Sequence, residues 1–209
     1  MNLRIEKFIT PPLETNTYVL LSGATAAVVD PGLAPQEVVE FLRERAAAVE
    51  LILLTHGHGD HIGGADDVKE AFPAAELVCP IRDVAMLTDS SLNLSSPFGM
   101  TVTAPPADRT LEPGQSVGVG ETKWCVLDTS GHTPGGVSYY CPDAGVVLTG
   151  DALFAGSIGR CDIPMASETH LLTTIRENLL CLPDETRVLP GHGPETTIGA
   201  ERRGNPFLR

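Results

Sequence analysis

Short apolar segments along the chain follow the two-residue period of β-strands in some places and the longer period of amphipathic helices in others. Residues 3–9 alternate apolar and polar side chains, which predicts a strand that ends before Pro11-Pro12. Ser22-Gly23 separates two β-rich runs, 17–21 and 25–30, and this arrangement is typical of a hairpin. Seven further short apolar runs are predicted to be strands, at residues 51–54, 77–79, 117–119, 123–127, 137–141, 145–148 and 187–189.

Helical periodicity appears between these strands. Pro35 lies near the first turn of a helix predicted to run to about Ala48, with one apolar stripe. Three more helices are predicted at residues 61–72, 81–87 and 168–180. Ser167 is the expected N-cap of the last one, because a serine side chain accepts hydrogen bonds from the first turn. Residues 88–110 are rich in Ser, Thr and Pro and lack periodicity, so we expect a long connection over one edge of a functional site.

Strand-rich and helix-bearing segments therefore succeed each other twice. Both halves carry Gly-His followed by Gly-Gly, at 57–58 with 63–64 and at 131–132 with 135–136, which hints at a duplicated βα unit. Two sheets packed together with helices outside would bury the apolar faces of all these elements. We predict an α/β fold in one domain, residues 1–209, since this length suits a single core.

Composition and charge narrow the classes of protein. With 42% hydrophobic and 20% charged residues, the chain has the profile of a globular protein. A net charge of −13 argues against a nucleic-acid partner, which needs clustered Lys and Arg. No apolar run approaches the roughly 20 residues of a membrane helix, so no membrane partner is expected. The N-terminal segment lacks the apolar core of a signal peptide, and we expect a cytoplasmic protein.

Five cysteines, at positions 79, 125, 141, 161 and 181, are scattered and never form a C-x-x-C pair. Four lie in or beside apolar runs, where a free cysteine behaves as a small buried hydrophobic residue. We expect reduced, structural cysteines. Cys161 differs because it lies in a Gly-rich loop, where it could line a site.

The segment 55–64, T-H-G-H-G-D-H-I-G-G, carries the main chemical signal of the chain. It places His56, His58, Asp60 and His61 at a predicted strand-to-helix turn. Imidazole and carboxylate groups are ligands for zinc, iron or manganese. A loop of this kind lets several donors face one cavity.

Three later turns repeat the pattern of a strand, then Gly, then a ligand-type residue. They carry His132, Asp151 and His192. Five of the six histidines therefore lie in these four turns, which favours a shared metal site over scattered imidazoles. The sixth, His170, lies in the predicted helix 168–180 and is interpreted as an ordinary histidine. Seven donors suit two ions that share a carboxylate and a hydroxide, about 3.5–4 Å apart.

The chain resembles the metallo-β-lactamase superfamily over residues 15–195. The resemblance rests on four motifs that occur in this order: H-x-H-x-D-H, G-H-T-P-G, T-G-D and G-H. The resemblance implies an αββα sandwich of two mixed sheets with outer helices and a metal site at one edge between the sheets. It implies two divalent ions, with zinc favoured and iron or manganese as alternatives. The implied ligands are His56, His58 and His132 for one ion, Asp60, His61 and His192 for the other, and Asp151 as a bridge.

A hydrolytic role follows from this resemblance. Metal binding lowers the pKa of water to about 7, so that hydroxide can attack an acyl carbon. Asp60 is the predicted catalytic residue, because it could orient that hydroxide and hold the released proton. Ser130 precedes His132 in a turn and is not interpreted as a nucleophile.

Residues 153–164, L-F-A-G-S-I-G-R-C-D-I-P, are similar to the glyoxalase II branch, which hydrolyses hydroxyacyl-glutathione thioesters. That branch has a basic residue where Arg160 stands, so Arg160 is a predicted substrate-binding residue. The sequence ends about 17 residues after His192, so the C-terminal helical domain of that branch is not expected here. Asp162 stands where that branch has an aromatic residue. The chain resembles instead the shorter, single-domain bacterial glyoxalase II-like group. The expected partner is a small-molecule thioester, with the thiol left open.

Other readings of the same residues remain. Persulfide dioxygenases share the fold and the G-R-x-D loop, here residues 159–162, and use one iron held by two His and one Asp. The paired Asp60-His61 also fits a lactonase or another ester hydrolase of the superfamily. A non-catalytic metal-binding module would need a closed site without exchangeable water, and a nuclease is disfavoured by the acidic charge. The sequence does not assign an oligomeric state.

Overall fold

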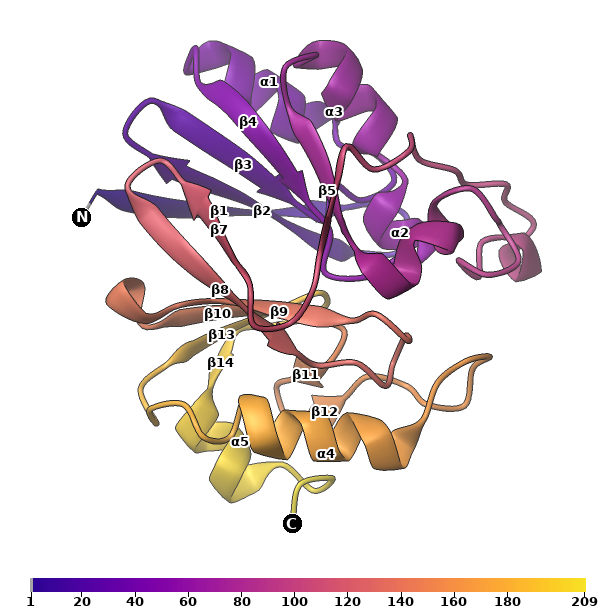
Figure 1. Cartoon of the computed structure of the whole chain (residues 1–209), viewed down its shortest axis with the longest axis vertical. Helices are drawn as coiled ribbons and strands as arrows, with labels where there is room; N and C mark the ends of the chain where they lie inside the picture. The colour runs from indigo at the N-terminus through magenta and orange to yellow at the C-terminus, as the bar shows by residue number, and fades with distance from the viewer. Residues whose placement is uncertain (1) are drawn as a thin grey trace.

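The computed structural model describes residues 2–209 and shows two six-stranded mixed sheets stacked face to face, with helices on both outer faces (Figure 1). The first sheet has the order β1 (Leu3–Thr10), β2 (Thr15–Ser22), β3 (Thr25–Val29), β4 (Ala48–Leu53), β5 (Glu76–Pro80) and β6 (Arg109–Leu111). The second has the order β14 (Thr196–Thr197), β13 (Arg187–Pro190), β10 (Val146–Gly150), β9 (Val137–Cys141), β8 (Thr122–Asp128) and β7 (Ser116–Val119). The predicted αββα sandwich is confirmed.

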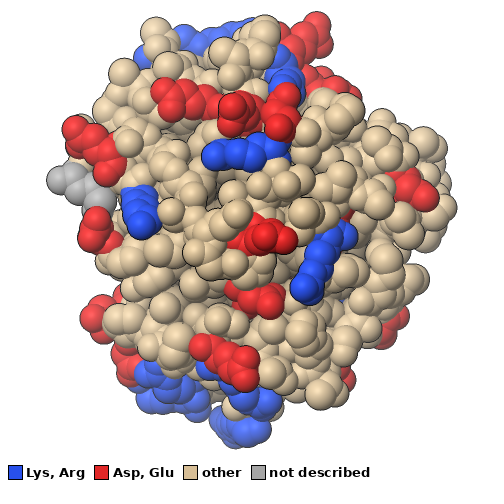
Figure 2. Space-filling view, in the orientation of Figure 1, with Lys and Arg blue, Asp and Glu red and all other residues tan. Residues whose placement is uncertain are grey.

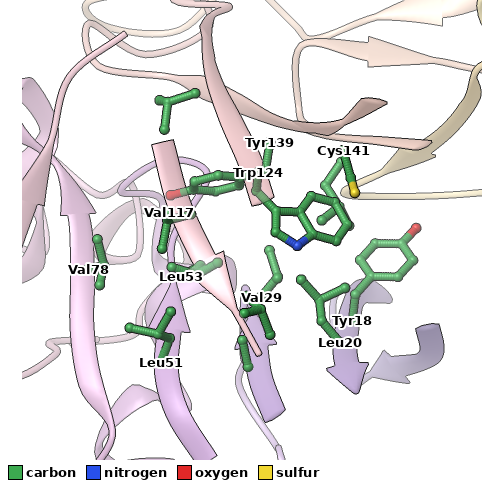
Figure 3. Packing of buried hydrophobic residues seen from close by; sticks show 14 of the residues in the cluster. Tyr18, Leu20, Val29, Leu51, Leu53, Val78, Val117, Trp124, Tyr139 and Cys141 are labelled. Atoms are coloured by element: carbon green, nitrogen blue, oxygen red, sulfur yellow. The ribbon is translucent and has the colours of Figure 1, made fainter. Parts of the chain in front are cut away.

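The core between the sheets is built by the alternation of side chains along buried strands. In β4, Leu51 and Leu53 point into the layer between the sheets, while Ile52 points to the outer face. Trp124 of β8 and Tyr139 of β9 meet this layer from the second sheet, and both are fully buried (Figure 3). Because each large apolar side chain contributes roughly 1.5–3 kcal/mol when buried, this layer is the main attraction between the sheets.

The outer helices cover the opposite faces of the two sheets. Helices α1 (Gln36–Glu44) and α3 (Ala65–Ala71) lie over the first sheet, as Figure 1 shows, and bury residues such as Leu42 and Val68 against Ile52. Helices α4 (Glu168–Asn178) and α5 (Ile198–Gly204) lie over the second sheet. Leu171 and Ile175 of α4 are fully buried in that layer. Each sheet is therefore apolar on both faces, which explains the nearly continuous apolar runs of β4 and β10.

Several predicted boundaries are wrong. The first helix ends at Glu44, not near residue 48, because Ala46 adopts φ 48° and Ala48 already pairs with Thr25 in the sheet. The predicted helix 61–72 is two helices, α2 (Gly59–Ile62) and α3, since two glycines at 63–64 weaken a helix and lie tightly against the loop that precedes α1.

Other elements differ in type or were not predicted. Residues Ile81–Leu87 form a 3-10 helix, η1, and the predicted connection 88–110 contains the 3-10 turn η2 (Ser96–Phe98) and the start of β6. The 3-10 turn η3 (Pro142–Ala144), the small hairpin of β11 (Leu153–Phe154) and β12 (Ser157–Ile158), and also β14 and α5, had no periodic signal. The predicted N-cap is confirmed, because Ser167 accepts a hydrogen bond from the His170 N–H. Within residues 2–209, no helix has the length and apolar character needed to cross a bilayer.

Candidate metal centre

All seven predicted donors lie at one edge of the sandwich, after strands that end there. His56 to His61 follow β4 of the first sheet, and the other three donors follow β8, β10 and β13 of the second. Glycines make the sharp turns possible. At Gly150, φ is +49° and a Cβ would collide with Thr55, while Gly131, with φ +131°, lies against the backbone of Leu171. The turns therefore require glycine for both conformation and space.

Three imidazoles form the first donor cluster. His58 Nδ1 lies 3.1 Å from His56 Nε2 and 3.0 Å from His132 Nε2. All three side chains are buried. Ligands about 2.0–2.1 Å from a tetrahedral ion are separated by roughly 3.3–3.4 Å, so these nitrogens are spaced for one shared ion.

Asp60, His61 and His192 form the second donor cluster. Asp60 Oδ2 lies 3.1 Å from His192 Nε2 and 3.5 Å from His61 Nε2. Asp151 lies between the clusters: its Oδ1 is 3.4 Å from His61 Nε2, and its Oδ2 is 3.6 Å from His132 Nε2. One carboxylate therefore reaches a donor of each cluster. The structure brings all seven residues together.

Two buried atoms test whether a metal fits. His61 Nε2 and Asp151 Oδ1 are inaccessible to solvent, and within residues 2–209 neither has a hydrogen-bond partner. An unpaired buried polar atom costs roughly 1–3 kcal/mol, so such atoms at a donor cluster indicate an interaction with a ligand. Imidazole and carboxylate donors suit divalent ions, and the residues present therefore fit the two-ion arrangement.

The outward-facing nitrogen of four imidazoles has a hydrogen-bond partner of its own. The pairs are His56 Nδ1 with Thr55 Oγ1 (3.0 Å), His61 Nδ1 with Asp30 Oδ2 (3.0 Å), His132 Nδ1 with Arg160 O (2.9 Å) and His192 Nδ1 with Glu14 O (3.3 Å). Partners of this kind fix the ring orientation and the tautomer, leaving Nε2 free to bind a metal. His58 is the exception, since it presents Nδ1 to the cluster.

Burial and mutual proximity set the protonation states. Burial, with neighbouring imidazoles, lowers the pKa of His56 well below its usual range and that of His58 to about 3. Burial alone would raise the pKa values of Asp60 and Asp151, but the neighbouring histidines, with His61 the strongest, together outweigh it and lower both pKa values. Burial would lower the pKa of His61, but the surrounding carboxylates raise it. Neutral His56 and His58 and ionised carboxylates are the forms that bind metals, and ion binding would release the proton of His61.

Asp30, directly after β3, is a supporting residue that was not among the predicted site residues. Its Oδ1 accepts a hydrogen bond from the Thr55 N–H (2.8 Å), and its Oδ2 accepts from Thr55 Oγ1 (2.7 Å) and contacts His61. Asp30 has φ +49°, which is unusual for a residue other than glycine and fits a constrained functional turn. A signal was present, because Asp30 follows a buried strand and precedes Pro31-Gly32, as the predicted ligands follow strands beside glycines.

Asp83, in η1, is the second supporting residue, and its side chain is fully buried. Its Oδ2 accepts hydrogen bonds from the Gly57 N–H (3.0 Å) and Thr133 Oγ1 (2.7 Å), and its Oδ1 accepts from the Gly135 N–H (2.7 Å). Burial raises the pKa of Asp83, while these three donors act in the opposite direction. Asp83 therefore links the loop of His56 and His58 to the loop of His132. No local sequence signal marks it.

A cavity of about 480 Å³ opens over the donor clusters and reaches His58, Asp60, Asp151 and His192. Six residues of the long connection line it, namely Asn93, Leu94, Ser95, Pro97, Phe98 and Met100, which confirms that this connection covers one edge of the site. Arg160 also lines it. The Arg160 side chain is 61% exposed and pairs with Asp162 through Nε–Oδ1 (2.9 Å) and Nη2–Oδ2 (3.0 Å) contacts.

His170 lies outside the donor clusters, as expected, and pairs with a serine. Its Nε2 is 2.9 Å from Ser130 Oγ, which also contacts Asp128 Oδ1 at 2.6 Å. Ser130 is buried, and its hydroxyl holds the turn before His132 in place. All five cysteines are free, with Cys79 and Cys141 buried and Cys181 exposed.

The sequence profile of the metallo-beta-lactamase superfamily matches residues 10–192. The chain is similar to the probable metallo-hydrolase YqgX of Bacillus subtilis, with 41% identity over 94% of this chain and 93% of that protein. It is also similar to hydroxyacylglutathione hydrolase GloC of Haemophilus influenzae, with 35% identity over 88% of this chain and 87% of that protein.

Two solved structures have the same architecture. One is the BLEG-1 B3 metallo-beta-lactamase, with a TM-score of 0.94 and 38% identity over 98% of this chain and 99% of that chain. The other is TTHA1623 in a di-iron-bound form, with a TM-score of 0.87 and 36% identity over 97% of this chain and 100% of that chain.

Proposed function

The chain belongs to the metallo-β-lactamase superfamily and has the fold and donor groups of a metal-dependent hydrolase, and on that premise we propose that it hydrolyses a thioester of the hydroxyacyl-glutathione type. The observation that carries this proposal is the pair of donor clusters joined by Asp151 beneath an open cavity. We propose His56, His58 and His132 as ligands of one ion, Asp60, His61 and His192 as ligands of the second, and Asp151 as the bridge.

Two divalent ions at this site would supply Lewis acidity, which makes water acidic enough to ionise near neutral pH and polarises a carbonyl group. Zinc is the proposed metal because imidazole and carboxylate donors suit it. Iron is the alternative metal, because the similar protein TTHA1623 was solved in a di-iron-bound form.

Asp60 is the proposed catalytic carboxylate. It lines the cavity, and Thr15 Oγ1 donates a hydrogen bond of 3.1 Å to its Oδ2. The lowered pKa keeps Asp60 ionised, so it can accept a hydrogen bond from the attacking water and orient it. His192 Nε2 lies 3.1 Å from the same oxygen, a spacing that suits two ligands of one ion.

The thioester class is supported by two observations. One is the similarity to GloC, a hydroxyacylglutathione hydrolase. The other is Arg160, whose guanidinium lies on the cavity rim and can bind a substrate carboxylate. We propose Arg160 as a substrate-binding residue, through the part of its fork that Asp162 leaves free. The same Arg160–Asp162 loop also fits a mononuclear-iron oxygenase. The experiment must therefore test for oxygenase activity as well as for thioester hydrolysis.

The test is hydrolysis of S-lactoylglutathione by the purified protein, followed as release of free thiol, with metal content measured on the same sample. We expect about two ions per chain and loss of activity on chelation, with recovery on adding zinc, iron or manganese. One iron per chain with oxygen uptake and no thiol release would favour the oxygenase instead.

Variants connect the activity to the donors. His58→Ala and Asp151→Ala should lose metal and activity together. His170→Ala is the matched control, because this sixth histidine lies outside both clusters and should leave metal content unchanged. A variant that loses its metal but turns over substrate at the wild-type rate would refute the proposed mechanism.

A further inference from the structure

The cavity above the donor clusters has a polar floor and an apolar wall. The donors form the floor. The wall, which we call the apolar wall, consists of Leu13, Leu94, Phe98, Met100 and Ile163. These residues come from three separate stretches of chain: the turn between β1 and β2, the connection 88–108, and the loop after β12. The cavity is therefore apolar on several sides around a charged centre.

The apolar wall is held in place relative to the donors. Asn93 is buried, and its Nδ2 donates hydrogen bonds of 2.9 Å to the Met86 and Val102 carbonyl groups. The Asn93 carbonyl accepts a 2.8 Å bond from the N–H of Gly59, which lies between His58 and Asp60. The segment that carries Leu94 and Phe98 is thus bonded directly to a donor loop, and the wall is preformed.

Two of the five side chains of the apolar wall are exposed, and the other three are half-buried. Phe98 is 63% exposed and Leu13 is 38% exposed, and the two come from different stretches of the chain. Exposed apolar surface that gathers around a concave site marks the binding of an apolar ligand group.

Positive charge is scarce around the cavity. Arg160 is the single basic side chain (Lys or Arg) among the lining residues. Two nitrogens of its guanidinium group, Nε and Nη2, already donate to the Asp162 carboxylate. Elsewhere on the face shown in Figure 2, acidic and basic side chains are interspersed. Glutathione carries two carboxylates and an ammonium group, and Arg160 can pair with only one of the carboxylates. Charges that enter an apolar cavity without partners lose hydration at a large cost.

We propose that this cavity prefers an apolar, uncharged thiol portion, so that thioesters of an apolar thiol are better substrates than the corresponding glutathione thioesters. This inference rests on the proposed thioester hydrolysis. A cavity of about 480 Å³ is of the size that holds a drug-sized ligand, far larger than a small hydroxyacyl group. The thiol portion must therefore occupy most of it, against the apolar wall.

The experiment compares two thioesters with the same lactoyl group, one of benzyl mercaptan and one of glutathione, using the metal-loaded full chain. We expect kcat/KM to be at least about tenfold higher for the benzyl thioester. Binding of the matching non-hydrolysable 2-hydroxypropyl thioethers, measured by calorimetry, gives a readout that does not depend on turnover. The benzyl thioether should bind more tightly than the glutathione thioether.

A surface variant assigns the preference to the wall. Phe98→Ser should weaken binding of the benzyl thioether by roughly five- to tenfold, because it removes apolar contact area, and should leave the glutathione thioether nearly unchanged. Phe207→Ser is the matched control, since Phe207 is also exposed (46%) but does not line the cavity.

The outcomes separate the two proposals. Equal or tighter binding of the glutathione thioether, or no effect of Phe98→Ser, overturns the apolar preference even if both thioesters are hydrolysed. If neither thioester is hydrolysed but the benzyl thioether binds more tightly in a Phe98-dependent way, the preference of the cavity stands and the proposed reaction fails.

Discussion

Asp83 links two donor loops from different sheets, and replacing it by Ala would test how the metal centre is held together. In the native protein its carboxylate accepts hydrogen bonds from the Gly57 N–H, Thr133 Oγ1 and the Gly135 N–H. Gly57 lies between His56 and His58, and Thr133 directly follows His132. Asp83→Ala removes all three acceptor contacts at once without touching a donor side chain.

The expected cost follows from the three donors left behind. A buried donor without a partner costs about 1–3 kcal/mol, and the side chain of Asp83 is fully buried. Relief of the desolvation of the carboxylate and entry of water offset part of this sum. We expect a net loss of about 3 kcal/mol in the free energy of unfolding, which lowers Tm by roughly 6–12 °C for a chain of this size. Loss of such a supporting residue also weakens metal affinity by about 10- to 100-fold.

Urea unfolding of the metal-free protein measures the stability term, and competition with a chromophoric chelator measures zinc affinity. Asp83→Asn has the same shape but places an amide N–H where an acceptor is needed, so it should lose stability as well, by a smaller amount. Asp143→Ala is the control, because Asp143 is exposed in η3. If Asp83→Ala lost less than about 1 kcal/mol and kept zinc affinity within about twofold, the role assigned to Asp83 would be wrong.

Three further predictions concern other parts of the molecule. Tyr139→Phe should lower the free energy of unfolding by about 1–2 kcal/mol in urea, because the Leu54 carbonyl loses a buried 2.7 Å hydrogen bond; an unchanged midpoint would contradict this. Asp30→Ala should reduce metal content toward one ion per chain by elemental analysis, since one imidazole of the second cluster loses its support; full occupancy would exclude that role. Burial raises the pKa of the Cys79 thiol, so at pH 8 iodoacetamide should modify the exposed Cys181 first and Cys79 only on unfolding, as peptide mass spectrometry would show.

The donor residues could be predicted from sequence because their signals are local. Each follows an apolar run and lies beside glycine, and histidine is rare enough in this chain that five in such turns are informative. The strands of the core were also recognisable, since β4 and β9 are apolar runs of strand length. The structure confirms the fold and the gathering of the donors, while the assignment of each donor to an ion stays a prediction.

What the sequence could not show depends on long-range contacts. Asp83 lies in an apolar, helix-like segment, and one of its partners, Gly135, is 52 residues away. Strand β6 has three residues and exists through its parallel pairing with β5. The run of alanines 46–48 favours a helix by propensity, but Ala48 is taken into the sheet beside Thr25, and tertiary pairing overrides propensity there.

The polar floor and the apolar wall of the cavity are encoded by different stretches of the chain. The donors leave from the ends of β4, β8, β10 and β13, whereas Leu94, Phe98 and Met100 belong to a connection that contributes no donor. Asn93 is the point where the two are joined, through Gly59. Substitutions in that connection can thus change substrate selectivity while the metal centre keeps its geometry. A laboratory search for altered substrate range would therefore vary Leu94, Phe98 and Met100 and keep Asn93 unchanged.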